Sequence, residues 1–103
     1  MSLSTHVLDT AAGCPATGVR VRLERDEPAS GWRLAAEAVT DVDGRVGALP
    51  LTAPGRWRLV FDTSARSEFF PEVTIAFEVG DPAEHHHVPL LLAPYGYSTY
   101  RGS

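Results

Sequence analysis

The segment VTIAFEV, residues 73–79, alternates large apolar side chains with small or polar ones. Successive side chains of an extended strand point to opposite faces, so a period of two predicts a strand with one buried face. Residues 19–24 (VRVRLE) and 56–61 (RWRLVF) largely follow the same alternation. These three segments therefore predict half-buried β-strands.

Turn-forming residues divide the chain at intervals of about ten residues, a spacing typical of antiparallel sandwiches and barrels. They are Gly13-Cys14-Pro15, Asp26-Glu27-Pro28, Asp43-Gly44, Pro54-Gly55, Gly80-Asp81-Pro82 and Pro94-Tyr95-Gly96. Asp43-Gly44 is also the standard signal of a tight hairpin turn, and it puts Arg45 at the start of the next strand. Together with the alternating segments, these turns predict an all-β fold.

Two segments have mixed patterns. Residues 32–39 carry apolar side chains at helical spacing, but they also alternate as a strand through Trp32, Leu34, Ala36 and Ala38. We predict a strand there. Residues 64–70 have the composition of a short helix with Ser64 as its N-cap, and we predict one helical turn.

The composition limits the class of protein. The chain has 103 residues, 44% of them hydrophobic and 21% charged, so we expect one ordered domain over residues 1–103. A net charge of −4 argues against a nucleic-acid partner. No apolar run reaches the roughly 20 residues of a membrane helix, and no signal peptide is evident. The single cysteine, Cys14, forbids an internal disulfide and favours a reducing compartment, so we expect a cytoplasmic location.

The histidine run 85–87 is the first candidate site. On a strand, His85 and His87 share a face and His86 points away. One interpretation is an exposed polar start of a strand. Another is a catalytic or zinc-binding pair, with His6 as a third ligand.

The last part of the chain contains two unusual features. Residues 88–92 (VPLLL) are apolar on both faces, which predicts a second buried surface such as a subunit interface. Residues 94–103 (PYGYSTYRGS) carry three tyrosines, a threonine and an arginine, whereas most chain ends are polar and frayed. This density of strand formers and hydrogen-bond donors predicts a final strand that is packed down.

Eight short segments, spread from end to end, resemble the 5-hydroxyisourate hydrolases, the transthyretin-like enzymes of urate breakdown. They are residues 3–10 (LSTHVLDT), 13–16 (GCPA), 18–19 (GV), 40–45 (TDVDGR), 61–63 (FDT), 69–73 (FFPEV), 85–92 (HHHVPLLL) and 97–103 (YSTYRGS). One position departs from the family pattern, because His86 stands where the family usually has tyrosine. The resemblance implies a transthyretin/prealbumin-like sandwich of two four-stranded sheets with one short helix.

The resemblance also implies the activity. The substrate would be 5-hydroxyisourate, whose six-membered ring is opened by hydrolysis at a cyclic amide bond. The product would be 2-oxo-4-hydroxy-4-carboxy-5-ureidoimidazoline, and no cofactor or metal is implied. Family members are homotetramers with sites in a channel between dimers, so a short chain gains a site that two subunits complete.

The family's catalytic positions correspond here to His6, Arg45, His87 and Ser103. Imidazoles would activate water near neutral pH, and the guanidinium would orient the polar ring and stabilise negative charge. The residues that would bind substrate are Arg45, Ser103, Tyr100 and Arg101. His85, on the same face as His87, would support His87 without contacting the substrate. The alternatives are a transthyretin-like small-ligand carrier, which shares the fold, and the zinc hydrolase.

Overall fold

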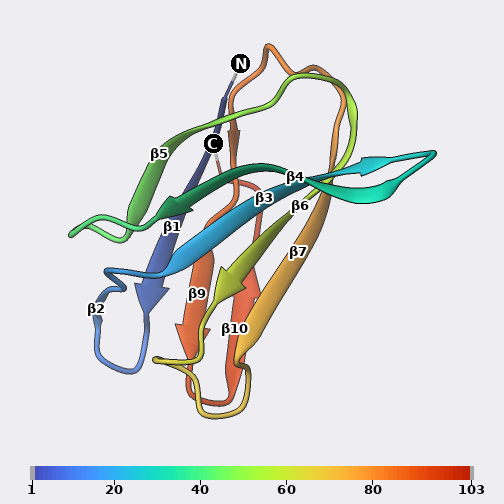
Figure 1. Ribbon diagram of the computed structural model, residues 1–103. Coiled ribbons are helices and arrows are strands. Elements are labelled where there is room, and N and C mark those ends of the chain that lie inside the picture. Colours follow the sequence, from blue (N-terminus) through green and yellow to red (C-terminus); the bar gives the residue numbers. More distant parts are fainter. Residues whose placement is uncertain (1, 103) are drawn as a thin grey trace.

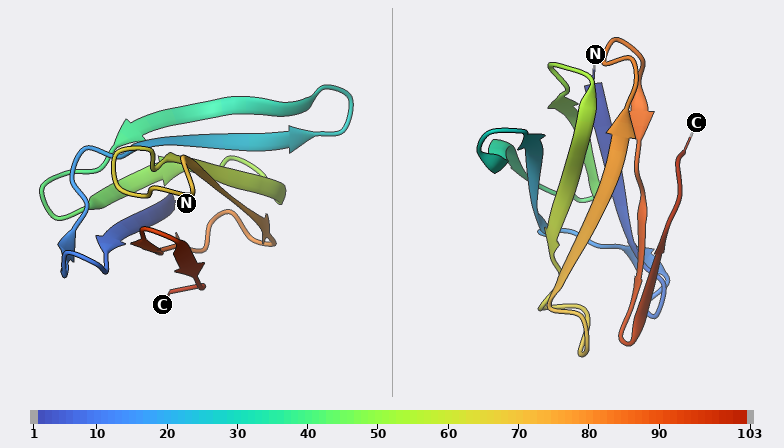
Figure 2. Two further views of the ribbon diagram at one scale, coloured as in Figure 1. Left: turned by 90° about the horizontal axis from the view of Figure 1, so that it is seen from below. Right: turned by 90° about the vertical axis from the view of Figure 1, so that its right-hand side faces the viewer.

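The computed structural model describes residues 2–102, which form two β-sheets packed face to face (Figures 1 and 2). One sheet is antiparallel with the strand order β4-β3-β6-β7. Its strands are β3 (Arg20–Glu27), β4 (Gly31–Val39), β6 (Gly55–Asp62) and β7 (Glu72–Val79). The predicted all-β sandwich is confirmed. None of the described segments forms an apolar helix of membrane-spanning length.

The other sheet is built on β1 (Ser2–Asp9), which has strand neighbours on both sides. Two short segments pair with β1 in parallel along one edge, and two others pair with it antiparallel along the other edge. The last strand, β10, pairs with β9. The segments are β2 (Cys14–Pro15), β5 (Arg45–Pro50), β8 (His86–His87), β9 (Leu90–Ala93) and β10 (Gly96–Thr99). Pro89, which has no backbone N–H to donate, lies in the gap between β8 and β9. This sheet therefore has six strand segments where four strands were expected.

The core lies between the sheets and consists of the inward side chains of the alternating strands. Trp57, Leu59 and Phe61 of β6 are completely buried, as are Leu3 and Val7 of β1. Because side chains alternate along a strand, burial of one face of β1 leaves the other face to point away from the core.

Strand β4 is confirmed, but its predicted single apolar face is wrong. Leu23 of β3 pairs with Ala36, while the next residue, Glu24, pairs with Leu34. Ala35 is therefore an extra residue, a β-bulge, which reverses the side-chain alternation at that point. Ala36 packs against the core, whereas Leu34 is 55% exposed. The apolar residues at helical spacing therefore do not share a buried face, since Leu34 and Val39 are both exposed.

Residues 64–70, where one helical turn was predicted, form a hydrogen-bonded turn but no helix. The Thr63 carbonyl accepts from the backbone N–H groups of Arg66 and Ser67, at 3.0 and 2.9 Å, which closes a single turn. The backbone N–H of Phe70 then donates to the Ser67 hydroxyl at 3.1 Å instead of continuing a helical ladder. A serine side chain that competes for a backbone donor in this way ends the turn.

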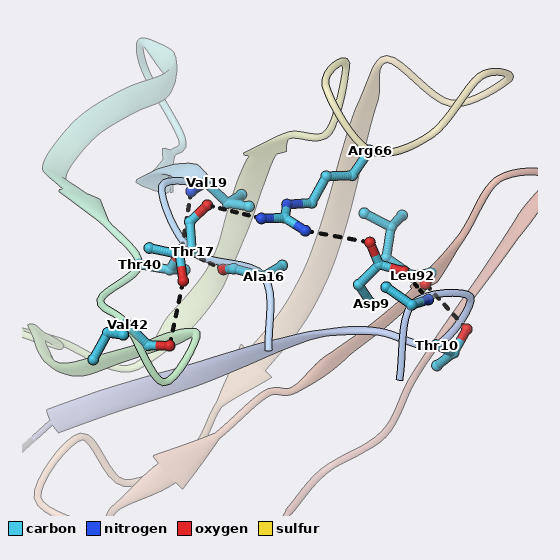
Figure 3. A network of polar contacts seen from close by, with 10 residues as sticks. Asp9, Thr10, Ala16, Thr17, Val19, Thr40, Val42, Arg66 and Leu92 are labelled. Carbon is cyan, nitrogen blue, oxygen red and sulfur yellow. Dashed lines mark hydrogen bonds and ion pairs between the residues drawn. The ribbon is translucent and has the colours of Figure 1, made fainter. Parts of the chain in front are cut away.

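The same turn is tied to the other sheet through Arg66 (Figure 3). Its guanidinium donates to Asp9 Oδ2 and to the Thr17 carbonyl, each at 3.3 Å. The Thr17 hydroxyl donates in turn to the Val42 carbonyl at 3.3 Å. This network joins the end of β1 to three loops at that end of the sandwich.

The turn at residues 41–44 carries the chain from one sheet to the other. Strand β4 pairs with β3, and β5 pairs with β1, so the predicted hairpin between them is wrong. The predicted turn and the position of Arg45 at the start of β5 are confirmed. Asp41 Oδ1 accepts from the backbone N–H groups of Asp43 and Arg45, both at 2.9 Å, and Gly44 has a φ of 75°.

Gly44→Ala should destabilise the fold, because an added Cβ would collide with the Val7 backbone oxygen in a conformation that already disfavours side chains. We expect a loss of more than about 2 kcal/mol in the free energy of unfolding, measured by urea denaturation. Gly13→Ala is the matched control, since Gly13 has a φ of 71° and open space around it. Equal losses in the two variants would show that the contact with β1 has no energetic role.

Candidate active site

The outward face of β1 brings three expected site residues together. His6 pairs in register with Arg45 of β5 on one side, and Ser4 pairs with His87 of β8 on the other. Ser2, Ser4 and His6 occupy alternate positions, opposite the buried Leu3 and its inward neighbours. Residues 6, 45 and 87 are thus neighbours because two strands flank β1.

A hollow of about 300 Å³ opens on this face. The residues that line it are Ser4, Thr5, Arg45, Val46, Gly47, His85 and His87. Among these described residues there is one guanidinium, two imidazoles and no carboxylate. The hollow therefore suits a polar, electron-rich ligand that accepts hydrogen bonds.

His6 is held by the turn that also starts β5. Its Nε2 lies 2.8 Å from the backbone oxygen of Asp43. A carbonyl oxygen can only accept, so Nε2 carries the proton and donates it. The neutral ring then has its lone pair on Nδ1, and the hydrogen bond sets both the tautomer and the orientation of the imidazole.

His87 is half-buried, and its Nδ1 lies 2.8 Å from the Ser4 hydroxyl oxygen. Burial lowers the pKa of the His87 imidazole, and a hydrogen bond to the Ser4 backbone opposes part of this shift. A proton on His6 or His85, and the permanent charge of Arg45, lower it further. His87 is therefore neutral near pH 7 and able to accept a proton.

The other two histidines of the run lie as strand alternation predicts. His85 is exposed on the face of His87, with Nδ1 3.0 Å from the Ser2 hydroxyl and Nε2 3.1 Å from the Ser4 hydroxyl. His86 is buried on the opposite face, and its Nδ1 donates to the Glu84 carbonyl at 2.7 Å.

The zinc alternative finds no ligand set here. Within residues 2–102, no three histidine, cysteine, aspartate or glutamate side chains gather closely enough to hold a metal ion. His85 and His87 instead contact serine hydroxyls.

The end of the described chain packs on His87. Gly102 forms an isolated bridge with His87 and donates its backbone N–H to the His87 carbonyl at 2.8 Å. Arg101 forms an ion pair with Glu84 at 2.8 Å, away from the hollow. Tyr100 and Arg101 border a second, apolar pocket of about 230 Å³ between the sheets. Ser103 lies outside the described residues.

Ser2 and Ser4 are site residues to which the sequence analysis assigned no role. Serine is common on exposed strand faces, so nothing in its type marked them. The only signal in the sequence is their spacing, because residues 2, 4 and 6 share the outward face of β1.

The model of the HIUase/Transthyretin family matches residues 3–102. The chain belongs to this family. The 5-hydroxyisourate hydrolase of Salmonella dublin is 46% identical, and the match covers 98% of this chain and 80% of that protein. The solved 5-hydroxyisourate hydrolase of Klebsiella pneumoniae is 39% identical, with a TM-score of 0.84 over 99% of this chain and 93% of its own.

Solved transthyretin is similar as well. Sea bream transthyretin in complex with thyroxine is 27% identical, with a TM-score of 0.89 over 97% of this chain and 93% of its own. The backbone thus resembles both the hydrolase and the thyroxine-binding protein, and the backbone alone does not separate hydrolysis from carriage. The sequence identity is higher to the hydrolases.

Gly102→Ala should displace the His87 ring, because a Cβ at residue 102 would collide with its Cδ2 atom. We expect the pKa of His87, measured by NMR titration, to rise toward the ordinary histidine value as the ring becomes hydrated. Gly96→Ala is the control in the same terminal segment, since a Cβ there meets open space. An unchanged His87 titration in Gly102→Ala would mean that the chain end does not hold the ring.

Proposed function

We propose that this chain hydrolyses 5-hydroxyisourate to 2-oxo-4-hydroxy-4-carboxy-5-ureidoimidazoline, a step of urate degradation, without a cofactor. The observation that carries the proposal is the register of β1, in which His6 pairs with Arg45 and Ser4 pairs with His87, beside an open, carboxylate-free hollow lined by Arg45 and His87. Family membership and the activity named for the relatives support it.

His87 is the general base in this proposal. Its lowered pKa keeps the ring neutral near pH 7, which a base requires. Water loses a proton to the imidazole as its oxygen bonds to the cyclic amide carbon. The carbon–nitrogen bond then breaks, and the nitrogen receives a proton.

Arg45 and His6 act on the substrate from the β5 edge of β1, whereas His87 lies at the β8 edge. The Arg45 guanidinium is exposed beside the hollow and offers paired donors to the ring and to the developing oxyanion. His6, oriented by the Asp43 carbonyl, has its Nδ1 lone pair beside Arg45, where it takes the second proton of the attacking water and passes it to the leaving nitrogen.

The terminal residues complete the proposal. Gly102 lies against His87. The family resemblance supports a role for Ser103 in contacting substrate or a histidine. Within a single chain, Tyr100 and Arg101 border the apolar pocket and not the hollow beside His87. We therefore propose that they contact substrate only where subunits meet.

We also propose a cytoplasmic homotetramer of single domains, with each site completed where two dimers meet. Leu8 and Leu91 pair on the outward face of the β1 sheet and remain partly exposed, which supports burial by another copy. The free cysteine Cys14 suits a reducing compartment.

Light scattering at micromolar protein should give about 44 kDa, four times the chain mass of 11.1 kDa. A monomer would contradict the tetramer.

His87→Ala, His6→Ala and Arg45→Ala should each remain folded and lose about a hundredfold or more in kcat, because each removes a base, a proton donor or an oxyanion donor. Activity is measured as the decay of absorbance of 5-hydroxyisourate made freshly from urate by urate oxidase. His86→Tyr is the control, since residue 86 faces away from the hollow, and it should remain active.

The pH profile should carry the signature of His87. A base must be neutral, so kcat/KM should fall as the pH drops through the pKa of His87. Because that pKa is lowered, the midpoint should lie below the ordinary histidine value of about 6.5. Wild-type rates in His87→Ala, or substrate binding without turnover by the unmodified protein, would contradict the proposal.

A further inference from the structure

Three side chains outside the expected catalytic set form a continuous line that ends at His87. The Ser2 hydroxyl lies 3.0 Å from His85 Nδ1, and His85 Nε2 lies 3.1 Å from the Ser4 hydroxyl. The Ser4 hydroxyl lies 2.8 Å from His87 Nδ1. The line occupies both ring nitrogens of His85 and only one of His87, so His87 Nε2 is not part of it.

These groups can donate and accept in either of two directions along the line, and only one direction leaves His87 Nε2 free to accept a proton. If His87 accepts a proton at Nε2, its neutral ring carries hydrogen on Nδ1, which donates to the Ser4 oxygen. The single hydroxyl hydrogen of Ser4 then donates to His85 Nε2, and His85 Nδ1–H donates to the Ser2 oxygen. Each donor has one acceptor in this arrangement, and the reversed arrangement also satisfies every group. The two arrangements differ by one proton moved along the line.

The line also connects two environments. The contact between Ser4 and His87 is partly buried, whereas both contacts of His85 are exposed. The basic groups that face His87 are Arg45 and His6 near β1 and His85 on its own segment. The permanent charge of Arg45 disfavours an imidazolium at residue 87, as does a proton on either of the other two rings, which favours passing a proton accepted there on toward solvent.

We propose that Ser4 and His85 form a proton relay from His87 to solvent, in which Ser4 is also the positioning residue that sets the His87 tautomer. The proposal rests on the proposed hydrolysis. Hydrolysis of a cyclic amide consumes one water, and one of its protons goes to the leaving nitrogen. The new carboxylic acid is ionised at neutral pH, so a second proton must leave the site in each turnover.

The relay accounts for that second proton. One proton enters at His87 Nε2, and the Nδ1 proton of His87 passes to Ser4. Ser4 passes its own proton to His85 Nε2, and His85 releases its Nδ1 proton through Ser2 to water. Three hydrogen bonds reverse, no bond between heavy atoms changes, and no co-reactant is needed.

The first test measures the His87 tautomer in the substrate-free protein by ¹⁵N NMR. At neutral pH the wild type should have a protonated Nδ1 and an unprotonated Nε2. Ser4→Thr keeps a hydroxyl on the strand and should preserve this tautomer, whereas Ser4→Ala should give a mixture. The wild-type tautomer in Ser4→Ala would overturn the positioning role of Ser4.

The second test measures turnover in His85→Gln, whose amide can still contact Ser4 but cannot pass a proton on. In weak buffer, kcat should fall about tenfold or more while KM changes less than about twofold. Added imidazole should restore kcat as its concentration rises, because it removes the proton from the site. Ser30→Ala, at an exposed serine of the turn between β3 and β4, is the control and should behave as wild type.

A wild-type kcat in His85→Gln would overturn the relay. A loss of kcat that imidazole does not restore would also overturn it, because such a loss reflects structure rather than proton transfer. If the wild type itself fails to open 5-hydroxyisourate, the proposed function fails and the relay falls with it. The NMR measurement on Ser4→Ala still decides the positioning role of Ser4 in that case, because it needs no turnover.

Discussion

Burial of one face of β1 is the constraint on which the site depends. Leu3, Thr5 and Val7 are essentially completely buried beneath the opposite sheet. Each large apolar side chain buried in this way contributes about 2 kcal/mol, and a slip of one residue in register would expose all of them. The penalty for such a slip fixes the outward face of β1, which presents Ser4 and His6.

Two strands then complete the arrangement from opposite sides. The turn before β5 uses the Asp41 side chain to hold the backbone of Arg45, and the Asp43 carbonyl in the same turn orients His6. On the other side, the backbone of Gly102 packs on the His87 ring, where no larger residue fits. The backbone elements that build the sheet therefore also orient the functional side chains, and little freedom remains in the site.

The shared backbone of the family shows where activity is decided. The same sandwich occurs in a hydrolase and in a thyroxine-binding transthyretin, so the core and the strand order do not select the function. We propose that the selection lies on the outward face of β1 and its neighbours. There two imidazoles and the guanidinium line an open hollow, and the Ser4 hydroxyl connects the exposed His85 to the half-buried His87.

The sequence by itself determined the fold class, because alternation in segments such as residues 73–79 has only one structural solution, a half-buried strand. Motif resemblance also named the three histidines and Arg45 that the structure places together. Periodicity could not reveal the bulge at Ala35, since an extra residue has meaning only against a partner strand. The helix predicted over residues 64–70 failed because the Ser67 hydroxyl takes a backbone donor, a competition that composition does not show. Ser4 gained its role only through the parallel pairing that sets it beside His87. Contacts between residues more than eighty positions apart depend on strand order and register, which only the tertiary structure decides.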